Sequence, residues 1–358
     1  MAAKDKIPSL ARKLPLIGRG KTGKAGAADL LTDEERKRRR RKAAALLAIL
    51  AALIVIAIIL IIRALTGSTP LPGLSSDLPH YVSSIYGTSE PMGVAVSPSG
   101  DRIYVTESEG RRLVRVYDSS GNEVGRLKPP GHNNAARLPV YVTVSPKTED
   151  VYVSDRLREV VEVYDPNGKY LRAFRPAGRL GKGANPLGLA FGPEGDLYMT
   201  DVSGSRKHHQ VLVFGSSGEK PQRRIGSRGM FWFPNGLAVD SSGDVYVADS
   251  NNGRLAIFNP AGKLVSSIQR GVGDGDLGLP RGVAIDGGRL FVVDTTSQAV
   301  KVYDLPNEVT EVPRYVGSFG VEGIGNGQFQ YPNGIAIDGS GRIYVTDREN
   351  GRVQVWAY

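Results

Sequence analysis

The chain has 358 residues and no cysteine, so it has neither a disulfide framework nor a cysteine that could ligate metal or act as a nucleophile. Its formal net charge is +10. Residues 1–42 hold 14 Lys and Arg against 5 Asp and Glu, which is +9 of that charge. The rest of the chain is therefore nearly neutral, and a strongly basic surface for nucleic acid is not expected there.

The N-terminal part of the chain contains one long apolar run. Residues 1–42 predict a basic, disordered tail, and 43–62 are 20 residues without a polar or charged side chain. A helix of that length, at about 1.5 Å per residue, spans a hydrocarbon core of about 30 Å. We therefore predict a transmembrane signal-anchor helix over 43–63.

The charges around this run set the expected orientation. Residues 36–42 are all cationic, whereas Arg63 is the nearest cation on the far side. The positive-inside rule then predicts a cytoplasmic N-terminus, with residues 36–42 against anionic lipid. A linker rich in Pro, Gly and Ser follows at 64–79, and it leads to an extracytoplasmic domain at 80–358. This layout, a single-pass protein of the cell membrane, is typical of bacteria.

Residues 80–358 contain an internal repeat. In 234–268, four apolar runs of four to six residues are separated by the turn sequences 241–244, 250–253 and 259–262, which predicts a four-stranded antiparallel meander. A Pro-x-Gly opening, degenerate in one copy, begins six such copies at 91–93, 139–141, 186–188, 234–236, 280–282 and 332–334. A period in the forties with four strands per copy predicts an all-β, six-bladed β-propeller.

The last copy ends after its third strand, at Tyr358. Residues 81–85 read Tyr-Val-Ser-Ser-Ile and closely match the fourth strand of another copy at 264–268. We therefore predict that the first strand of the domain completes the last blade and removes its free edge.

Copies four and six resemble NHL repeats. They share the pattern PNG(L/I)A(V/I)D, then G(D/R)(V/I)YV(A/T)D, then NGR and an aromatic in the third strand, and a glycine-rich run at 323–327 precedes Pro332. The resemblance covers about 80–358 and implies an NHL-type propeller. The family includes RNA binders, adhesion modules, sensor domains and enzymes, so the fold alone does not define a function.

The longer connectors between blades are predicted to share one face, the connector face, pointing away from the membrane. Binding usually lies on such loops. Eight residues on these loops are candidate ligand-binding residues: Arg156, Arg158, Arg206, Lys207, His208, His209, Phe231 and Trp232. The six basic residues form either an anion-capturing cluster or part of a solvated loop. The two aromatic residues form either a stacking platform or a plug between blades. Phe329 and Tyr331 are expected to be plugs.

An acid ends the second strand of every copy. Repetition in all six favours a structural cap that accepts backbone N–H groups over a ring of ligands, and Arg254 and Arg352 are interpreted in the same way. The six acids are Glu107, Asp155, Asp201, Asp249, Asp294 and Asp347.

The residue between Pro and Gly is expected to line the mouth of the central channel. Lactonases of related propeller folds, as the resemblance implies, hold metal there with acidic and Asn ligands. The six residues here contain no carboxylate: Met92, Val140, Leu187, Asn235, Arg281 and Asn333. A hard divalent cation needs several oxygens, so this is a poor calcium site, whereas Asn235, Arg281 and Asn333 suit a small anion.

A zinc site is also not expected. The NHL-like amidating lyases need His from several blades, but this chain has His80, His132 and the adjacent His208 and His209. We predict no metal, no cofactor and no catalytic residue. The expected function is non-catalytic recognition of a protein or envelope glycan, with a metal-dependent lactonase-like or lyase-like enzyme as the alternative and an RNA-binding propeller as the third hypothesis.

Overall fold

The computed structural model describes residues 78–358, apart from 132, 179–182 and 216–219, and scattered helical positions between Lys37 and Ile54. Most of the predicted tail at 1–42, anchor at 43–63 and linker at 64–79 lies outside the described residues. Among the residues that are described, no helix has the length and apolarity to cross a membrane. The propeller forms a compact unit of its own and is considered by itself.

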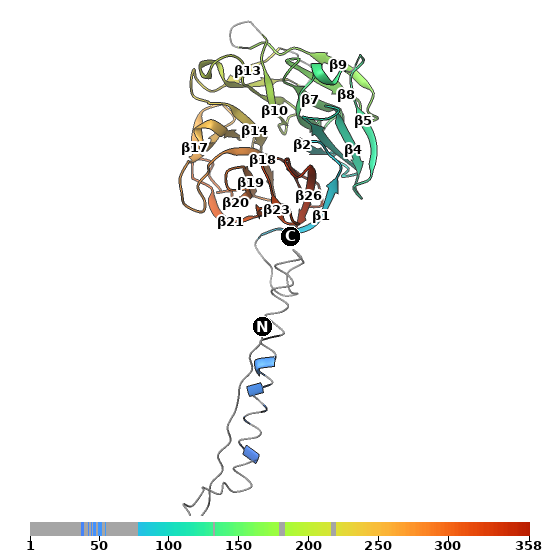
Figure 1. Cartoon of the computed structure of the whole chain (residues 1–358). Helices are drawn as coiled ribbons and strands as arrows, with labels where there is room; N and C mark the ends of the chain where they lie inside the picture. Colours follow the sequence, from blue (N-terminus) through green and yellow to red (C-terminus); the bar gives the residue numbers. More distant parts are fainter. Residues whose placement is uncertain are drawn as a thin grey trace, which may run out of the picture. The chain divides into compact units, whose positions relative to one another are not determined.

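Six four-stranded antiparallel sheets form a ring, as predicted (Figure 1). Blades 1 to 3 are β2(Pro91–Val96), β3(Arg102–Glu107), β4(Val114–Asp118) and β5(Glu123–Leu127); β6(Pro139–Val144), β7(Val151–Asp155), β8(Val160–Tyr164) and β9(Tyr170–Phe174); β10(Pro186–Phe191), β11(Leu197–Asp201), β12(Gln210–Phe214) and β13(Arg223–Ile225). Blades 4 to 6 are β14(Pro234–Val239), β15(Val245–Asp249), β16(Arg254–Phe258) and β17(Leu264–Ile268); β18(Pro280–Asp286), β19(Arg289–Asp294), β20(Ala299–Asp304) and β21(Arg314–Phe319); β24(Pro332–Ile337), β25(Ile343–Asp347), β26(Arg352–Ala357) and β1(His80–Tyr86).

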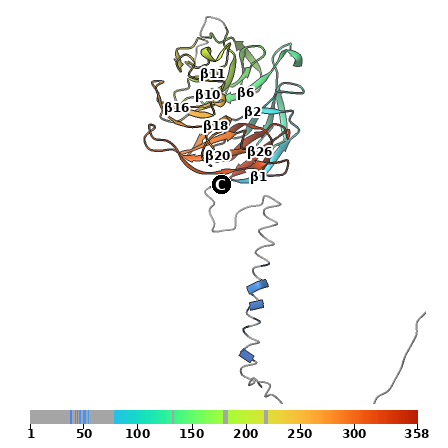
Figure 2. The same cartoon turned by 60° about the vertical axis from the view of Figure 1, so that its left-hand side comes forward.

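Three short 3-10 helices and a small two-stranded ribbon complete the described part of the propeller. They lie in loops and connectors: η1(Asn134–Ala136), η2(Arg206–His208), η3(Ser250–Asn252), and the parallel pair β22(Val321–Glu322) and β23(Gln328–Phe329). The first strand of each blade faces the centre of the ring, and the fourth lies at the rim (Figure 1, Figure 2).

The ring closes as predicted. Strand β1 pairs with β26 in antiparallel register, with Ser84 opposite Gln354 and Ile85 opposite Val353. Blade 6 therefore contains both ends of the domain. The pairing removes the free edge that an incomplete last blade would leave.

The hydrophobic core lies between neighbouring blades. Tyr246 of blade 4 and Val292 of blade 5, for example, belong to one buried cluster. Phe231 and Phe329 hold equivalent places in two connectors and are fully buried, packing against Phe258 and Trp356 at ring-centroid distances of 5.5 and 5.7 Å. The predicted role of Phe329 as a plug is confirmed, whereas that of Tyr331 is wrong, because its side chain is 55% exposed.

Glycine is required where the innermost strands meet. In five blades the Gly of Pro-x-Gly lies so close to the next blade that an added Cβ would be 2.2–2.7 Å from a backbone carbonyl oxygen: Gly93, Gly188, Gly236, Gly282 and Gly334. The equivalent residue of blade 2 is Tyr141, which has the same bulged register opposite Ser154. The ring of small residues thus has one large member.

The close approach predicts a specific cost for a single methyl group. Gly236→Ala would place a Cβ 2.5 Å from the Arg281 carbonyl oxygen, so we expect it to lower the free energy of unfolding by about 1–3 kcal/mol. Gly339→Ala is the matched control, because a Cβ there meets nothing within 4 Å. Denaturant unfolding of both variants checks this, and equal midpoints would contradict the close packing of the inner strands.

Candidate ligand site on the connector face

The acids that end the second strands attach the connectors to the ring. In every blade this carboxylate accepts the backbone N–H of a residue just before the proline that opens the same blade, at 2.7–3.1 Å; the donors are Ser89, Leu138, Asn185, Trp232, Leu279 and Gln330. The predicted structural role of the six acids is confirmed. The contacts also place the connectors and the second-to-third loops on one face.

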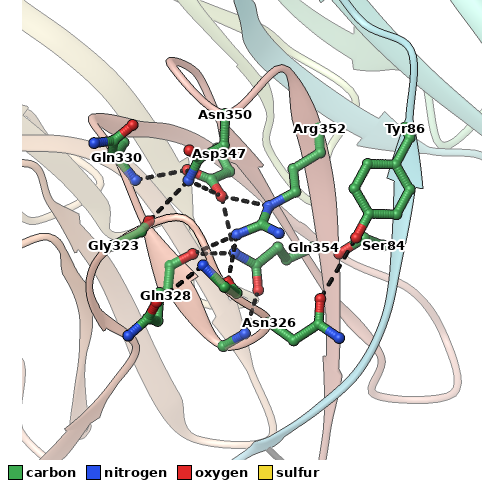
Figure 3. Close-up of polar contacts among 12 residues, drawn as sticks. Ser84, Tyr86, Gly323, Asn326, Gln328, Gln330, Asp347, Asn350, Arg352 and Gln354 are labelled. Carbon is green, nitrogen blue, oxygen red and sulfur yellow. Dashed lines mark hydrogen bonds and ion pairs between the residues drawn. The ribbon is translucent and has the colours of Figure 1, made fainter. Parts of the chain in front are cut away.

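Blade 6 shows how completely such an acid is used (Figure 3). Asp347 is fully buried and accepts from Gln330 N at 2.7 Å, Arg352 Nε at 2.7 Å and Gln354 Nε2 at 2.9 Å. Asn350 donates to the same carboxylate. Arg254 pairs with Asp249 in the same way, at 2.8 Å. These groups have no capacity left for a ligand.

Three connectors contain one extra residue between the capped N–H and the proline. Glu90, Phe233 and Tyr331 occupy this position, and each has a positive φ, of 46°, 58° and 52°. A residue before proline normally takes an extended conformation, and a left-handed one costs on the order of 1–3 kcal/mol. Blades 1, 4 and 6 therefore hold strained residues beside the channel mouth.

Two predicted candidates meet on the rim between blades 3 and 4. The Arg206 guanidinium lies over the Trp232 ring, 5.1 Å from its centroid, and donates to Asn252 Oδ1 at 3.2 Å. Trp232 stays 45% exposed. Lys207 is exposed and His208 half-buried beside them in η2. We call Arg206, Trp232 and Asn252 the rim patch.

For Phe231 the structure selects the plug over the stacking platform, and His209 is a correction to the predicted binding surface. Phe231 is fully buried between blades 3 and 4, so it is a core residue. His209 is 5% exposed, and its Nδ1 accepts the Phe233 N–H at 3.0 Å. Neither side chain is available to a ligand, because Phe231 is buried in the core and His209 packs against the connector between blades 3 and 4.

The same connector links the rim patch to the centre. Phe233 follows Trp232, and the Arg156 guanidinium lies 5.3 Å from the centroid of its ring. Arg156 also donates to Asn185 Oδ1 at 3.2 Å. Arg158, in contrast, pairs with the buried Glu162 at 2.6 Å, which ties it to blade 2.

The channel mouth brings together residues from four blades: Tyr141, Asn235, Arg281 and Asn333, with Met92 beside them. The Tyr141 hydroxyl donates to Asn235 Oδ1 at 3.0 Å and lies 3.4 Å from the Arg281 carbonyl oxygen. Asn333 Nδ2 donates to the Met92 carbonyl at 2.8 Å. Burial raises the pKa of Tyr141, so it remains a neutral hydroxyl. We call Tyr141, Asn235 and Arg281 the mouth cluster.

Sequence reasoning found Asn235, Arg281 and Asn333 but missed Tyr141. The repeat itself contained the signal for Tyr141, since it replaces the glycine of the other five copies. Phe233 belongs to the aromatic run 231–233 that is predicted as a stacking platform or a plug, and its contact with Arg156 was not expected. The described residues contain no group of three or more His, Asp or Glu that could hold a metal ion, and His132 lies outside them.

The fold and the site define this chain as a six-bladed propeller with a polar connector face. Residues 231–258 and 329–356 match the NHL repeat model. Human NHL-repeat-containing protein 4 is 32% identical over 124 residues, which cover 33% of this chain and 89% of that protein. The chain belongs to the NHL-repeat family.

Other relatives differ widely. Protein brain tumor of Drosophila melanogaster is 30% identical over 129 residues, 36% of this chain and 12% of that protein. Rat peptidylglycine alpha-amidating monooxygenase is 29% identical over 140 residues, 36% of this chain and 14% of that protein. The chain thus spans a small part of several of the curated relatives that it matches.

Solved structures support the fold alone. A streptogramin B lyase aligns with a TM-score of 0.55 at 13% identity, covering 78% of this chain and 97% of that one. An auxiliary nutrient binding protein from Bacteroides thetaiotaomicron gives 0.56 at 14% identity, covering 76% and 70%.

The burial of His209 predicts a pH dependence of stability. Burial lowers its pKa, with Asp201 and Asp249 opposing, so the unfolded chain takes up a proton first as the pH falls through its ordinary value of about 6.5. Stability should therefore be lower at about pH 5 than at about pH 7.5. His209→Asn, which keeps an acceptor, should weaken this dependence, whereas the rim variant His208→Asn should retain it. Thermal unfolding at both pH values measures the effect, and identical profiles for wild type and His209→Asn would contradict it.

Proposed function

We propose that this chain is a membrane-anchored, non-catalytic binding protein. Its propeller lies outside the cytoplasm and recognises a protein or an envelope glycan through the connector face. The observation that supports this function best is the rim patch, in which an arginine stacks on a half-exposed tryptophan on a closed, rigid ring.

The chemistry of the rim patch suits recognition. Tryptophan and arginine are enriched among residues that contribute most to binding, and a rigid aromatic ring loses little entropy on contact. A cation–π contact of about 0.5–1 kcal/mol at an exposed site keeps the ring in place before a ligand arrives. Asn252 fixes the other side of Arg206. The patch is therefore preorganised.

The relatives include proteins with several kinds of function, and the donor set decides between them. The mouth cluster offers an amide, a hydroxyl and a guanidinium, and the six residues that follow the opening prolines around the channel mouth include no carboxylate or imidazole. This set suits an anion better than zinc or calcium. The near-neutral charge of 43–358 also disfavours an RNA-binding role.

The rim patch gives a direct test. Immobilised full-length chain, solubilised in mild detergent, is exposed to envelope extract of the source organism, and the retained material is quantified before and after proteinase digestion of the extract. Trp232→Ala and Arg206→Gln should reduce retention about ten-fold or more. Lys263→Gln, on an exposed turn of the opposite face, should leave it unchanged. Full retention by Trp232→Ala would contradict the proposal, and the digestion separates a protein ligand from a glycan.

The proposed orientation has its own test. Proteinase added to intact cells should digest the propeller and spare an epitope tag placed within residues 1–42. Lysed cells should lose both. A propeller that survives until lysis would contradict the extracytoplasmic location.

A further inference from the structure

Arg281 carries a positive charge that no described residue neutralises. It stands between Pro280 and Gly282 at the start of β18, and its guanidinium forms no hydrogen bond or ion pair with another described residue. Its Nε is fully buried. The residue as a whole is half-buried. An unpaired cation in such a place is costly, because water solvates it less well than at an open surface.

A second donor in the same place is also unused. Asn235 is fully buried, and its Oδ1 is occupied by the Tyr141 hydroxyl, so the Nδ2 side of the amide is the free side. Tyr141 lies within reach of both Asn235 and the Arg281 backbone. The mouth cluster thus offers N–H groups from two blades, without a protein acceptor among the described residues.

The surroundings make the mouth cluster electropositive. Burial lowers the pKa of Arg281, Tyr141 opposes this shift, and Arg348 adds to it. Burial and the charge of Arg281 lower the pKa of Arg156. Arg348 is paired with Glu90 at 2.5 Å, but Arg156 contacts an amide oxygen and an aromatic ring and has no carboxylate partner. Positive charge therefore remains in excess at this point.

We propose that the mouth cluster binds the carboxylate group of a ligand, with the Arg281 guanidinium and the Asn235 Nδ2 amide donating to its oxygens. The Nε edge of a guanidinium presents parallel N–H donors that match a planar two-oxygen group. The ligand approaches from the connector face. This inference therefore rests on the proposed function, and it names the chemical group that is bound at the centre of that face.

Several features favour a carboxylate over a phosphate. Half of the channel mouth is apolar, formed by Val140, Leu187 and the adjoining Met92 and Phe233. A singly charged group with a hydrocarbon neighbour costs less to bury there than a phosphate dianion. Tyr141 is also one of the residues of the inner strands that line a channel space of about 350 Å³.

Calorimetry tests this with simple probes. Full-length chain in detergent is titrated with sodium benzoate and sodium acetate, and with sodium phosphate at matched ionic strength. Wild type should bind the carboxylates in preference to phosphate. Arg281→Gln should weaken benzoate binding about ten-fold or more, and Arg281→Lys should bind with intermediate affinity, because it keeps the charge and loses the fork. Arg228→Gln, an exposed arginine of a connector, is the control that should bind as wild type does.

Thermal unfolding without ligand separates a binding role from a structural one. Removing an unpaired, half-buried cation should leave the midpoint of Arg281→Gln equal to or above that of wild type. A lower midpoint together with unchanged benzoate affinity would overturn the proposal, and so would preferential binding of phosphate by wild type. Loss of benzoate binding in Arg281→Gln, combined with full envelope retention by Trp232→Ala, would uphold the carboxylate site and refute the function proposed for the rim patch.

Discussion

The close packing of the innermost strands determines the rest of this structure. In five blades a carbonyl group of the next blade leaves no room for a Cβ on the innermost strand, and hydroxyl groups reinforce the contact. Thr106, Ser154, Thr200 and Thr346 each donate to a carbonyl of the following blade at 2.7–3.0 Å. Because every blade is held at its inner edge, the spacing of the ring is fixed at the centre. The connectors must then fit the distances that this ring sets.

The connectors fit in two ways, and the difference creates the site. In blades 2, 3 and 5 the capped residue directly precedes the proline, whereas blades 1, 4 and 6 accommodate one more residue in a left-handed conformation. Phe233 is one of these, and it joins the exposed Trp232 to Arg156 and the channel mouth. Local strain on the order of 1–3 kcal/mol per residue persists because a buried acid holds the connector directly before each strained residue. The closed ring thus holds these residues in strained conformations that they would not keep in a loose loop.

The repeat pattern predicted the features that depend on regular spacing. Closure by residues 81–85, the six acids such as Asp347, and the plug Phe329 all follow from one unit recurring six times, and the structure confirms them. Pairwise contacts between connectors were beyond sequence reasoning. The stacking of Arg206 on Trp232 depends on how blades 3 and 4 are placed relative to each other. The position of His209 depends on its hydrogen bond from the Phe233 backbone N–H. Tyr331 was misassigned because an aromatic residue beside Phe329 suggested a second plug, whereas its position is the strained one.

The proposed sites lie largely where the copies differ. Tyr141 replaces a glycine, Arg281 stands where three other copies have Met92, Val140 and Leu187, and Trp232 has a glutamine as its counterpart in blade 6. The most direct measurement is the metal content of the purified full-length chain, by elemental analysis after dialysis without chelator. Recognition through a guanidinium and an amide predicts far less than one equivalent of zinc or calcium per chain. A stoichiometric metal ion would contradict non-catalytic binding and would direct attention to lactone and hydroxyglycine substrates.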